Sequence, residues 1–284
     1  MTVPSERLLI VNADDYGLTP AVSRGILRGA REGVITSTSV LVLGSGFSRS
    51  VGWLHDETPL GVGVHLALVG EDPPLCSAHD IPTLVDRRGH LPRSWRHLLP
   101  KVMAKRIDVA DVERELTAQI SAARDAGLTI DHLNSHQHVH MFPGLREVVV
   151  DLAHRFDVPA VRVTRTASRG PVGRMMRRLA ASLERELQAD GIVFACDAAG
   201  LQEAGRLDET AMLRALDRFA LTDAPSVELS GHPGEAEDDE RYRYRWGYHW
   251  GDELDGVLSP RVRQAVERHG FKLGTFRDLA ATKR

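Results

Sequence analysis

The chain has 284 residues, of which 42% are hydrophobic and 26% charged, and its formal net charge is −3. This length is ample for one large α/β domain, and the slightly acidic balance argues against a nucleic-acid partner. The sequence shows neither a signal peptide nor an apolar run of about 20 residues, and Cys76 and Cys196 form no disulfide or metal-binding pattern, so we expect a cytoplasmic protein.

Short apolar runs alternate with longer amphipathic ones along the whole chain. Residues 7–14 (RLLIVNAD) predict a buried strand, and residues 20–33 predict a helix that follows a Thr19 N-cap, begins at Pro20 and ends at Gly33. In chain order we then expect a strand at 37–43, a helix at 47–57, a strand at 60–68, a helix at 109–127, a strand at 130–136, a helix at 143–157, a strand at 159–165, a helix at 170–191, a strand at 192–197, a helix at 208–221, a strand at 226–232, a helix at 259–270 and a strand at 271–276.

This alternation indicates parallel strands joined by crossover helices, which fits either a (β/α) barrel or an open doubly wound sheet. Polar, metal-capable residues follow four separate strands, whereas an open sheet would gather them at one switch point. We therefore predict a single barrel-like domain over residues 1–284, with the active site at the carboxyl ends of the strands. A long loop is expected at 69–92 and an aromatic and basic segment at 241–250.

Two adjacent carboxylates, Asp14 and Asp15, end the first predicted strand. Aspartate is common in turns and at helix N-caps, but Thr19 already offers a cap for the following helix. Neighbouring side chains on an extended segment point to opposite faces. One carboxylate can therefore bind a metal while the other faces the substrate as a base.

Histidines stand at two other strands. His65 lies inside GVGVHLAL, where a lone histidine is more often a buried structural residue than a ligand. Its interest rises because His136 follows another strand, in the stretch DHLNSHQHVHMFP. An aspartate with two histidines is a plausible ligand set for Zn²⁺ or a similar divalent ion.

The remaining histidines of interest have weaker cases. His132 fits a buried structural imidazole, His138 fits a supporting or structural role, and His140 could serve either in the site or in packing. His232 ends a strand in ELSGHPGE, on the same predicted rim as the ligands. It could simply be placed by the turn, but its position favours a general acid.

Taken together, IVNADDYG, GVGVHLAL, DHLNSHQHVHMFP and SGHPGE resemble, in this order, the carbohydrate deacetylases of the YdjC/ChbG type, including relatives associated with hopanoid biosynthesis. The closing stretch LSPRVRQAVERHGFKLGTFRDL is also similar, so the resemblance covers nearly the whole chain. It implies a barrel-like fold related to polysaccharide deacetylases and metal-assisted removal of an N-acetyl group from an amino sugar or short oligosaccharide. The motifs imply Asp15, His65 and His136 as ligands of one divalent ion, zinc or magnesium, with Asp14 as the base and His232 as the acid. Asn134 departs from the family pattern, where an aspartate is expected, which puts any acid–base role of that position in doubt.

The mechanism implied by these roles starts with a water molecule that loses a proton to Asp14 and attacks the polarised acetyl carbonyl. His232 then protonates the departing amine. The alternatives are another metal-dependent hydrolase, such as a phosphoesterase or a glycosidase-like enzyme, and a glycan-binding barrel without turnover. A second metal site would favour phosphoester chemistry.

Two segments bear on the substrate. RYRYRWGYHW, at 241–250, could form an aromatic lid that stacks on sugar rings, or an exposed loop packed on the barrel. GRMMRRLAASLER, at 173–185, is a basic amphipathic helix that is either a solvated face or a peripheral contact with a lipid-linked glycoconjugate. Which sugar is used and whether the protein forms a homodimer stay open.

Overall fold

The computed structural model of the protein describes residues 7–57 and 59–282. The strands of this part of the chain are β1 (Arg7–Tyr16), β2 (Ser37–Val40), β3 (Gly61–Leu66), β4 (His132–Ser135), β5 (Ala160–Val161), β6 (Asp197–Ala199), β7 (Ser226–Gly231) and β8 (Phe271–Leu273). The α-helices are α1 (Pro20–Glu32), α2 (Phe47–Ser50), α3 (Trp95–Met103), α4 (Val109–Asp125), α5 (Arg146–Arg155), α6 (Pro171–Ala189), α7 (Glu209–Ala220), α8 (Trp250–Leu258), α9 (Pro260–Arg268) and α10 (Phe276–Ala281). Three 3₁₀ helices complete the set: η1 (Val51–Asp56), η2 (His136–Met141) and η3 (Arg241–Arg243).

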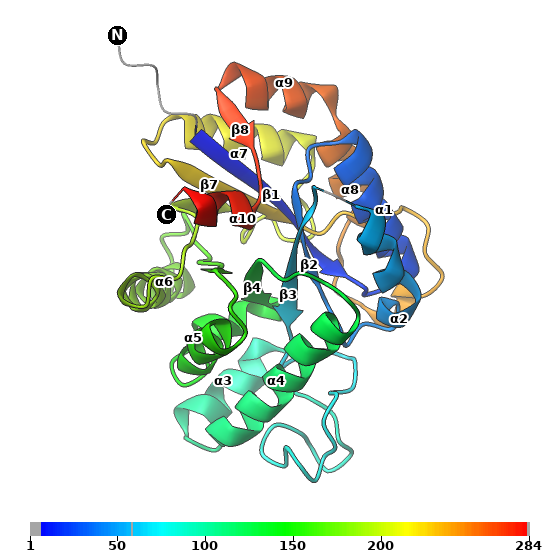
Figure 1. Cartoon of the computed structure of the whole chain (residues 1–284), viewed down its shortest axis with the longest axis vertical. Helices are drawn as coiled ribbons and strands as arrows, with labels where there is room; N and C mark the ends of the chain where they lie inside the picture. Colours follow the sequence, from blue (N-terminus) through cyan, green and yellow to red (C-terminus); the bar gives the residue numbers. More distant parts are fainter. Residues whose placement is uncertain (1–6, 58, 283–284) are drawn as a thin grey trace.

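The strands form one parallel sheet that curls on itself. Their order is β5-β4-β3-β2-β1-β7-β6, and β8 pairs with the first residues of β1 on the edge opposite β7. Figure 1 shows the strands at the centre of the molecule and the helices around them. This arrangement confirms the predicted barrel-like α/β fold.

The two edges of the sheet are joined by the segment that leads into β6. Val193 forms a parallel bridge with Ala160 of β5, and β6 itself pairs with β7. The segment therefore touches both ends of the strand order. The sequence predicts a strand at 192–197, but the observed strand β6 begins at Asp197. The chain pairs with β5 only at Val193 and then pairs with β7 along β6.

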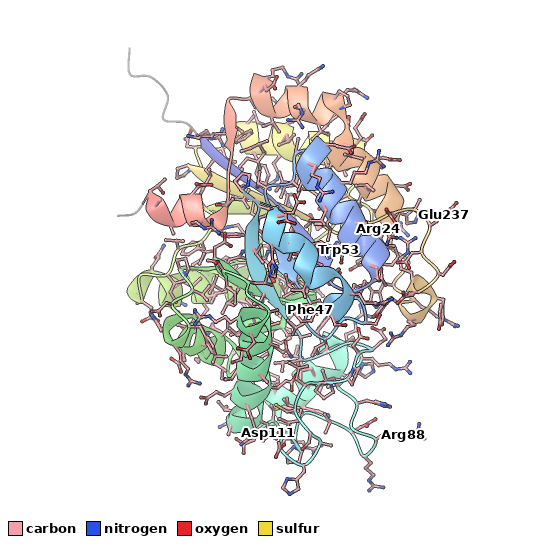
Figure 2. The ribbon with its side chains drawn as sticks, turned by 45° about the vertical axis from the view of Figure 1, so that its right-hand side comes forward. Arg24, Phe47, Trp53, Arg88, Asp111 and Glu237 are labelled. Atoms are coloured by element: carbon pink, nitrogen blue, oxygen red, sulfur yellow. The ribbon has the colours of Figure 1, made fainter. Side chains whose placement is uncertain are left out.

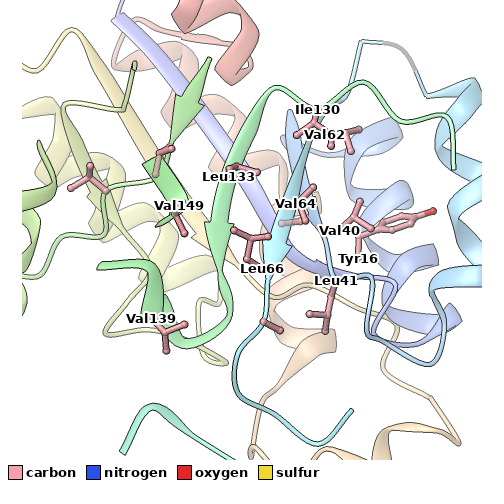
Figure 3. Close-up of a cluster of buried hydrophobic side chains, with 14 of the residues drawn as sticks. Tyr16, Val40, Leu41, Val62, Val64, Leu66, Ile130, Leu133, Val139 and Val149 are labelled. Carbon is pink, nitrogen blue, oxygen red and sulfur yellow. The ribbon is translucent and has the colours of Figure 1, made fainter. Parts of the chain in front are cut away.

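Alternation along the strands separates an apolar outer layer from a polar interior. Figure 3 shows Val62, Val64 and Leu66 of β3 beside Leu133 of β4 in one apolar cluster. Successive side chains of a strand point to opposite faces, so His65 lies on the other face of β3, toward the interior of the curl. All six residues of β3 are buried, as expected for a parallel strand that is covered on both sides.

The N-terminal caps of the helices follow the sequence signals. Thr19 caps α1 by accepting a hydrogen bond from the amide of Val22, with Pro20 at the first helical position. Asp108 caps α4 in the same way through the amide of Ala110. Within residues 7–57 and 59–282, no helix combines the length and apolar character that crossing a membrane requires.

Several short helices were not expected from the sequence. They are α3, α8 and α10, each of nine residues or fewer. The loop expected at 69–92 contains no helix or strand, and Figure 2 shows Arg88 projecting from it into solvent.

Candidate active site

The carboxyl end of β1 carries the two adjacent aspartates in an irregular backbone. The pairing register with β2 shifts between Ala13 and Tyr16, and Asp15 adopts a φ of 67°. This left-handed conformation is unusual for a residue other than glycine, and bulges of this kind re-aim side chains at the ends of strands. Asp14 and Asp15 do have different partners, but the bulge, not simple strand alternation, separates them.

Asp15, His65 and His136, here named the metal group, come together at this bulge. His65 Nε2 lies 3.4 Å from Asp15 Oδ1, and His136 Nδ1 lies 3.6 Å from the same oxygen. All three residues are buried, and a ligand atom from each lies within 4.8 Å of the others. Ligands held about 2.0–2.2 Å from a tetrahedral ion are about 3.4 Å apart, so the spacing suits a metal.

The hydrogen bonding of Asp15 also supports a metal site. Neither of its carboxylate oxygens has a hydrogen-bond partner among the described residues, although both are buried. An ionised carboxylate in such a place is costly unless a cation or donor compensates it. The donor set therefore fits a divalent ion held by Asp15 and the two imidazoles.

The side-chain amide of Asn134 in β4 lies against His65, 2.8 Å from Nδ1. With the NH₂ group toward the ring, the amide oxygen accepts hydrogen bonds from Arg162 and Ser39, and the nitrogen donates to His65 Nδ1. With the oxygen toward the ring, Nδ1–H donates to Oδ1, and the lone pair of Nε2 faces Asp15. Only the second orientation leaves Nε2 free to bind a metal, so metal binding would couple to the orientation of this amide.

The histidine-rich stretch after β4 leaves the extended conformation at once. Gln137 and His138 both have left-handed backbones, with φ of 53° and 56°. His136 therefore points toward Asp15 and His65. His138 Nδ1 hydrogen-bonds to Thr164 Oγ1, whereas His140 hydrogen-bonds to the Ser135 hydroxyl and the carbonyl of Arg162. His140 is structural, as is His132, which is fully buried and stacks on Phe276.

Asp14 lies in a buried ion-pair network. Arg162 Nη1 donates to Asp14 Oδ2 at 2.6 Å and Nη2 donates to Oδ1 at 2.8 Å, while Arg162 Nε donates to Glu228 Oε1 at 2.7 Å. Asp14 Oδ1 also accepts from Asn12 and Ser39, each at 2.8 Å. Oδ2 accepts only from Arg162 within the described chain, so it retains the capacity to accept another proton.

The two carboxylates that share Arg162 have opposite pKa shifts. Burial would raise the pKa of Asp14, but the charge of Arg162 and its hydrogen bonds to the carboxylate hold it well below the usual value. Burial raises the pKa of Glu228 more than Arg162 lowers it, in keeping with an Oε2 that lacks any described partner. Asp14 is therefore ionised throughout the neutral range.

The two histidines of the metal group also differ. Burial lowers the pKa of His65, so this ring is neutral and ready to bind an ion. Burial opposes a charge on His136 as well, yet the carboxylate of Asp15, 3.6 Å from Nδ1, raises its pKa. Protons would therefore compete with a metal more strongly at His136 than at His65.

His232 follows β7 on the same rim. Its backbone amide donates to Glu253 Oε2 of α8, and its ring packs on Tyr248 with centroids 4.8 Å apart. Ala13 of β1 pairs with Gly231 of β7, so Asp14 and His232 are the next residues along two neighbouring strands. His232 Nδ1 is buried and has no described partner.

A cleft of about 820 Å³ opens beside the metal group. His136 and His138 line it together with Trp95, Phe142, Trp246 and Tyr248. Trp246 covers His136, with ring centroids 4.9 Å apart, and donates from Nε1 to Glu71 in the long loop. The segment predicted as an aromatic lid therefore does lie over the site.

Not all of that segment faces the cleft. Tyr244 is buried and donates to Asp72 Oδ2 at 2.9 Å, which ties the segment to the long loop. Tyr242 is 75% exposed and lies outside the cleft lining. Figure 2 shows Glu237, in the acidic stretch just before this segment, at the surface near α1.

Sequence reasoning named Asp14, Asp15, His65, His136 and His232, and the structure brings all five to one rim. It missed three charged residues that support them: Arg162, Glu228 and Glu253. Arg162 and Glu228 stand between apolar neighbours inside predicted strands. A charged residue at such a position indicates a buried charge with a partner, and this signal could have identified both residues. Glu253 lies in α8, a helix that was not expected.

The chain is similar in sequence to two proteins named as deacetylases. A chitooligosaccharide deacetylase of Enterobacter sp. (strain 638) is 31% identical over 277 residues, which cover 96% of this chain and all of that protein. A carbohydrate deacetylase of Brevibacillus brevis is 40% identical over 151 residues, 53% of this chain and only 57% of that relative's length.

Solved structures agree on the fold. A protein of Enterococcus faecalis V583 named for cellobiose-phosphate cleavage superposes with a TM-score of 0.79 at 26% identity, over 97% of this chain and 99% of that one. A pseudoenzyme of the CE4 family superposes with a TM-score of 0.50 at 10% identity, over 98% of this chain and 68% of that one, which concerns the fold alone.

The family model described as YdjC-like protein matches residues 8–268, a span that holds every strand-end residue of the site. The chain therefore belongs to the YdjC-like protein family.

Proposed function

We propose that this protein hydrolyses the N-acetyl group of an amino sugar or short oligosaccharide, free or in a glycoconjugate, and releases acetate. The observation that carries the proposal is the buried carboxylate of Asp15. Both of its oxygens lack a described hydrogen-bond partner, and His65 and His136 lie beside it. The names of the relatives in Enterobacter and Brevibacillus supply the reaction class.

Asp15, His65 and His136 would hold one divalent ion. When bound, such an ion polarises the acetyl carbonyl and lowers the pKa of a water molecule. Imidazole ligands suit zinc better than magnesium, so this donor set favours Zn²⁺. Among the described residues this is the one group of three such ligands, which favours single-ion amide hydrolysis over the two-metal clamp of many phosphoesterases.

Asp14 is the general base of the proposed reaction. Arg162 holds both oxygens of the carboxylate in a fixed plane, and Oδ2 can still accept a proton from the attacking water. Its low pKa makes it a weak base, but it is always in the required ionised form. Fixed orientation within the site would offset part of the lost driving force.

His232 is the general acid. It donates a proton from Nε2 to the nitrogen of the sugar as the bond between that nitrogen and the acetyl carbon breaks. The backbone amide of His232 donates to Glu253, and Tyr248 packs against the His232 ring. The products are acetate and the free amine.

The cleft accounts for a sugar as the substrate. Trp95, Trp246 and Tyr248 offer aromatic faces, and Gln137 and Thr166 offer polar groups along the same wall. The two cysteines are free, and we propose a cytoplasmic location on the ground that a reducing compartment keeps such thiols unpaired. We further propose that the basic helix α6 can contact a lipid-linked substrate. We also propose that the protein can form a homodimer.

The test is acetate release from a panel of N-acetylated sugars, measured with and without a chelator. We expect release from at least one member, loss of release with the chelator, and recovery when Zn²⁺ is restored. Release of phosphate or of a free sugar in place of acetate would refute the proposed reaction. Acetate release that a chelator leaves unchanged, with no metal in the protein, would refute the metal site.

A further inference from the structure

Tyr248 packs on the ring of the proposed acid, His232, and lines the cleft beside the metal group. Its ring centroid lies 4.8 Å from that of His232 and 5.4 Å from those of Trp246 and Trp250. The same side chain lines the cleft together with His136. Tyr248 is therefore at the part of the cleft where a substrate would have to meet both His232 and the metal ligands.

The ring of Tyr248 packs against Gly205, a position at which the fold requires glycine. A Cβ on Gly205 would lie 2.1 Å from Tyr248 Cδ1, and Gly205 has a φ of 76°. Its carbonyl also accepts a hydrogen bond from the amide of His249 at 2.8 Å. Gly205 thus holds the backbone next to Tyr248 and leaves room for its ring, which gives the hydroxyl a fixed position.

The hydroxyl of Tyr248 has no hydrogen-bond partner within residues 7–57 and 59–282. The other two tyrosines that are not exposed do have one. Tyr16 donates to the carbonyl of Ser50 at 2.7 Å, and Tyr244 donates to Asp72 at 2.9 Å. A half-buried phenol that is held rigidly and left unbonded beside a reaction site is available to a ligand.

Nearby charges keep this hydroxyl protonated. Burial raises the pKa of Tyr248 above its ordinary value, and the carboxylates of Asp15, Glu253 and Asp14 raise it further. The group is therefore a hydrogen-bond donor at any working pH.

We propose that the Tyr248 hydroxyl donates a hydrogen bond to the acetyl oxygen of the substrate as negative charge develops on that oxygen. The assignment rests on the proposed deacetylation. An acetyl group attacked beside Asp15 and cleaved next to His232 must lie against the ring that packs on His232. A donor at this point binds the transition state more tightly than the ground state, because the oxygen gains charge only during the attack.

The test compares Tyr248→Phe with the wild-type protein on an N-acetylated sugar that the wild type deacetylates. We expect kcat to fall about 10²-fold, as when one oxyanion donor is removed, with KM changed no more than about twofold. Zinc content and the thermal unfolding midpoint should match those of the wild type. Tyr242→Phe removes an exposed hydroxyl from the same segment and should leave kcat unchanged.

Gly205→Ala tests the position of the hydroxyl and not its presence. The added methyl group would displace the Tyr248 ring, so we expect a loss of kcat similar to that of Tyr248→Phe. An unchanged kcat in Tyr248→Phe, or a rise in KM alone, would overturn the assignment, since the hydroxyl would then serve ground-state binding or nothing. If the wild type releases no acetate from any sugar, the proposed function fails and the role of Tyr248 fails with it.

Discussion

At the scale of single residues, two adjacent aspartates have different partners and different proposed roles. Asp14 and Asp15 are adjacent, yet one is bound by Arg162 and the other lacks a described partner. The bulge at the end of β1 creates this difference, because it turns Asp15 out of the strand's regular alternation. Two carboxylates in one location can thus serve two purposes.

We predict different losses for Asp14→Asn and Asp15→Asn. Asp14→Asn should lower turnover by about 10²–10⁴-fold, the usual effect of losing a positioned base, and leave zinc content nearly unchanged. Asp15→Asn should lower both, because a carboxylate ligand is lost. Turnover and metal content, measured on the same preparations, check the prediction. Equal metal loss in the two variants would show that the division of roles is wrong.

A second residue-scale prediction separates acid catalysis from pocket shape. His232→Ala should slow hydrolysis of an N-acetylated sugar by about 10²–10⁴-fold. The same variant should be much less impaired on an activated acetyl ester, whose leaving group departs without a proton. Parallel rate measurements on the two substrates, with metal analysis as the control, decide the matter. An equal loss on both would assign His232 to another role.

At the scale of elements, the loop that carries His232 is held against α1. Gly25 of α1 has no room for a side chain, since a Cβ there would lie 2.6 Å from Gly234 Cα and 2.7 Å from the amide nitrogen of Glu235. Glu235 also donates its amide to the carbonyl of Ala21. The helix surface therefore fixes the distance between α1 and the turn that follows β7.

We predict that Gly25→Ala destabilises the protein and impairs catalysis. Helix propensity alone would favour alanine by about 1 kcal/mol, but the backbone contact should outweigh it and cost about 1–3 kcal/mol. Denaturant unfolding and kcat/KM measure the two effects. Gly52→Ala is the matched control, because nothing lies within 4 Å of a Cβ at Gly52. Stabilisation in both variants would mean that the loop simply moves away.

The elements also show where sequence reasoning reached its limit. Strands with strong apolar runs, such as β1 and β3, and the long helix α4 were predicted nearly to their ends. The nine-residue α8 was missed because two glycines interrupt WGDELDGVL and weaken its helical pattern. β6 was misplaced because its segment divides its pairing between two partners.

The site shows the same limit. Asp15, His65 and His136 were predictable because they occur in distinctive local motifs. The contacts of Arg162 with Asp14 and Glu228 join residues 148 and 66 positions apart, and only the curl of the sheet brings them together. No local pattern encodes such a pairing, although a charge within an apolar strand indicates that some partner must exist.

At the scale of the whole molecule, the metal group joins β1, β3 and the residues after β4. Any ion held there would link the ends of three strands of the sheet. A ligand that binds only the folded state stabilises that state by mass action, by about 2.7 kcal/mol at 100 times its Kd.

We therefore predict that Zn²⁺ raises the thermal unfolding midpoint of the chelator-treated protein, and that this rise shrinks as the pH falls. A protonated imidazole cannot bind a metal, and Asp15 raises the pKa of His136. Protons should thus displace the ion as the pH falls through this raised value, starting above the ordinary histidine pKa of about 6.5. Thermal scans with and without Zn²⁺ between pH 8 and 5, a range of ~3 units around that value, measure this. His136→Asn is the control and should show little rise at any pH.

The position of β1 has a consequence for how the chain acquires its fold. β1 pairs with β2, β7 and β8, and the last two lie more than 200 residues later in the sequence. During synthesis the strand that carries both aspartates must wait for these partners to leave the ribosome, and such distant pairings slow folding. Until then its apolar edge is open to wrong pairings, so the nascent chain would depend on chaperones longer than a protein with mostly local contacts.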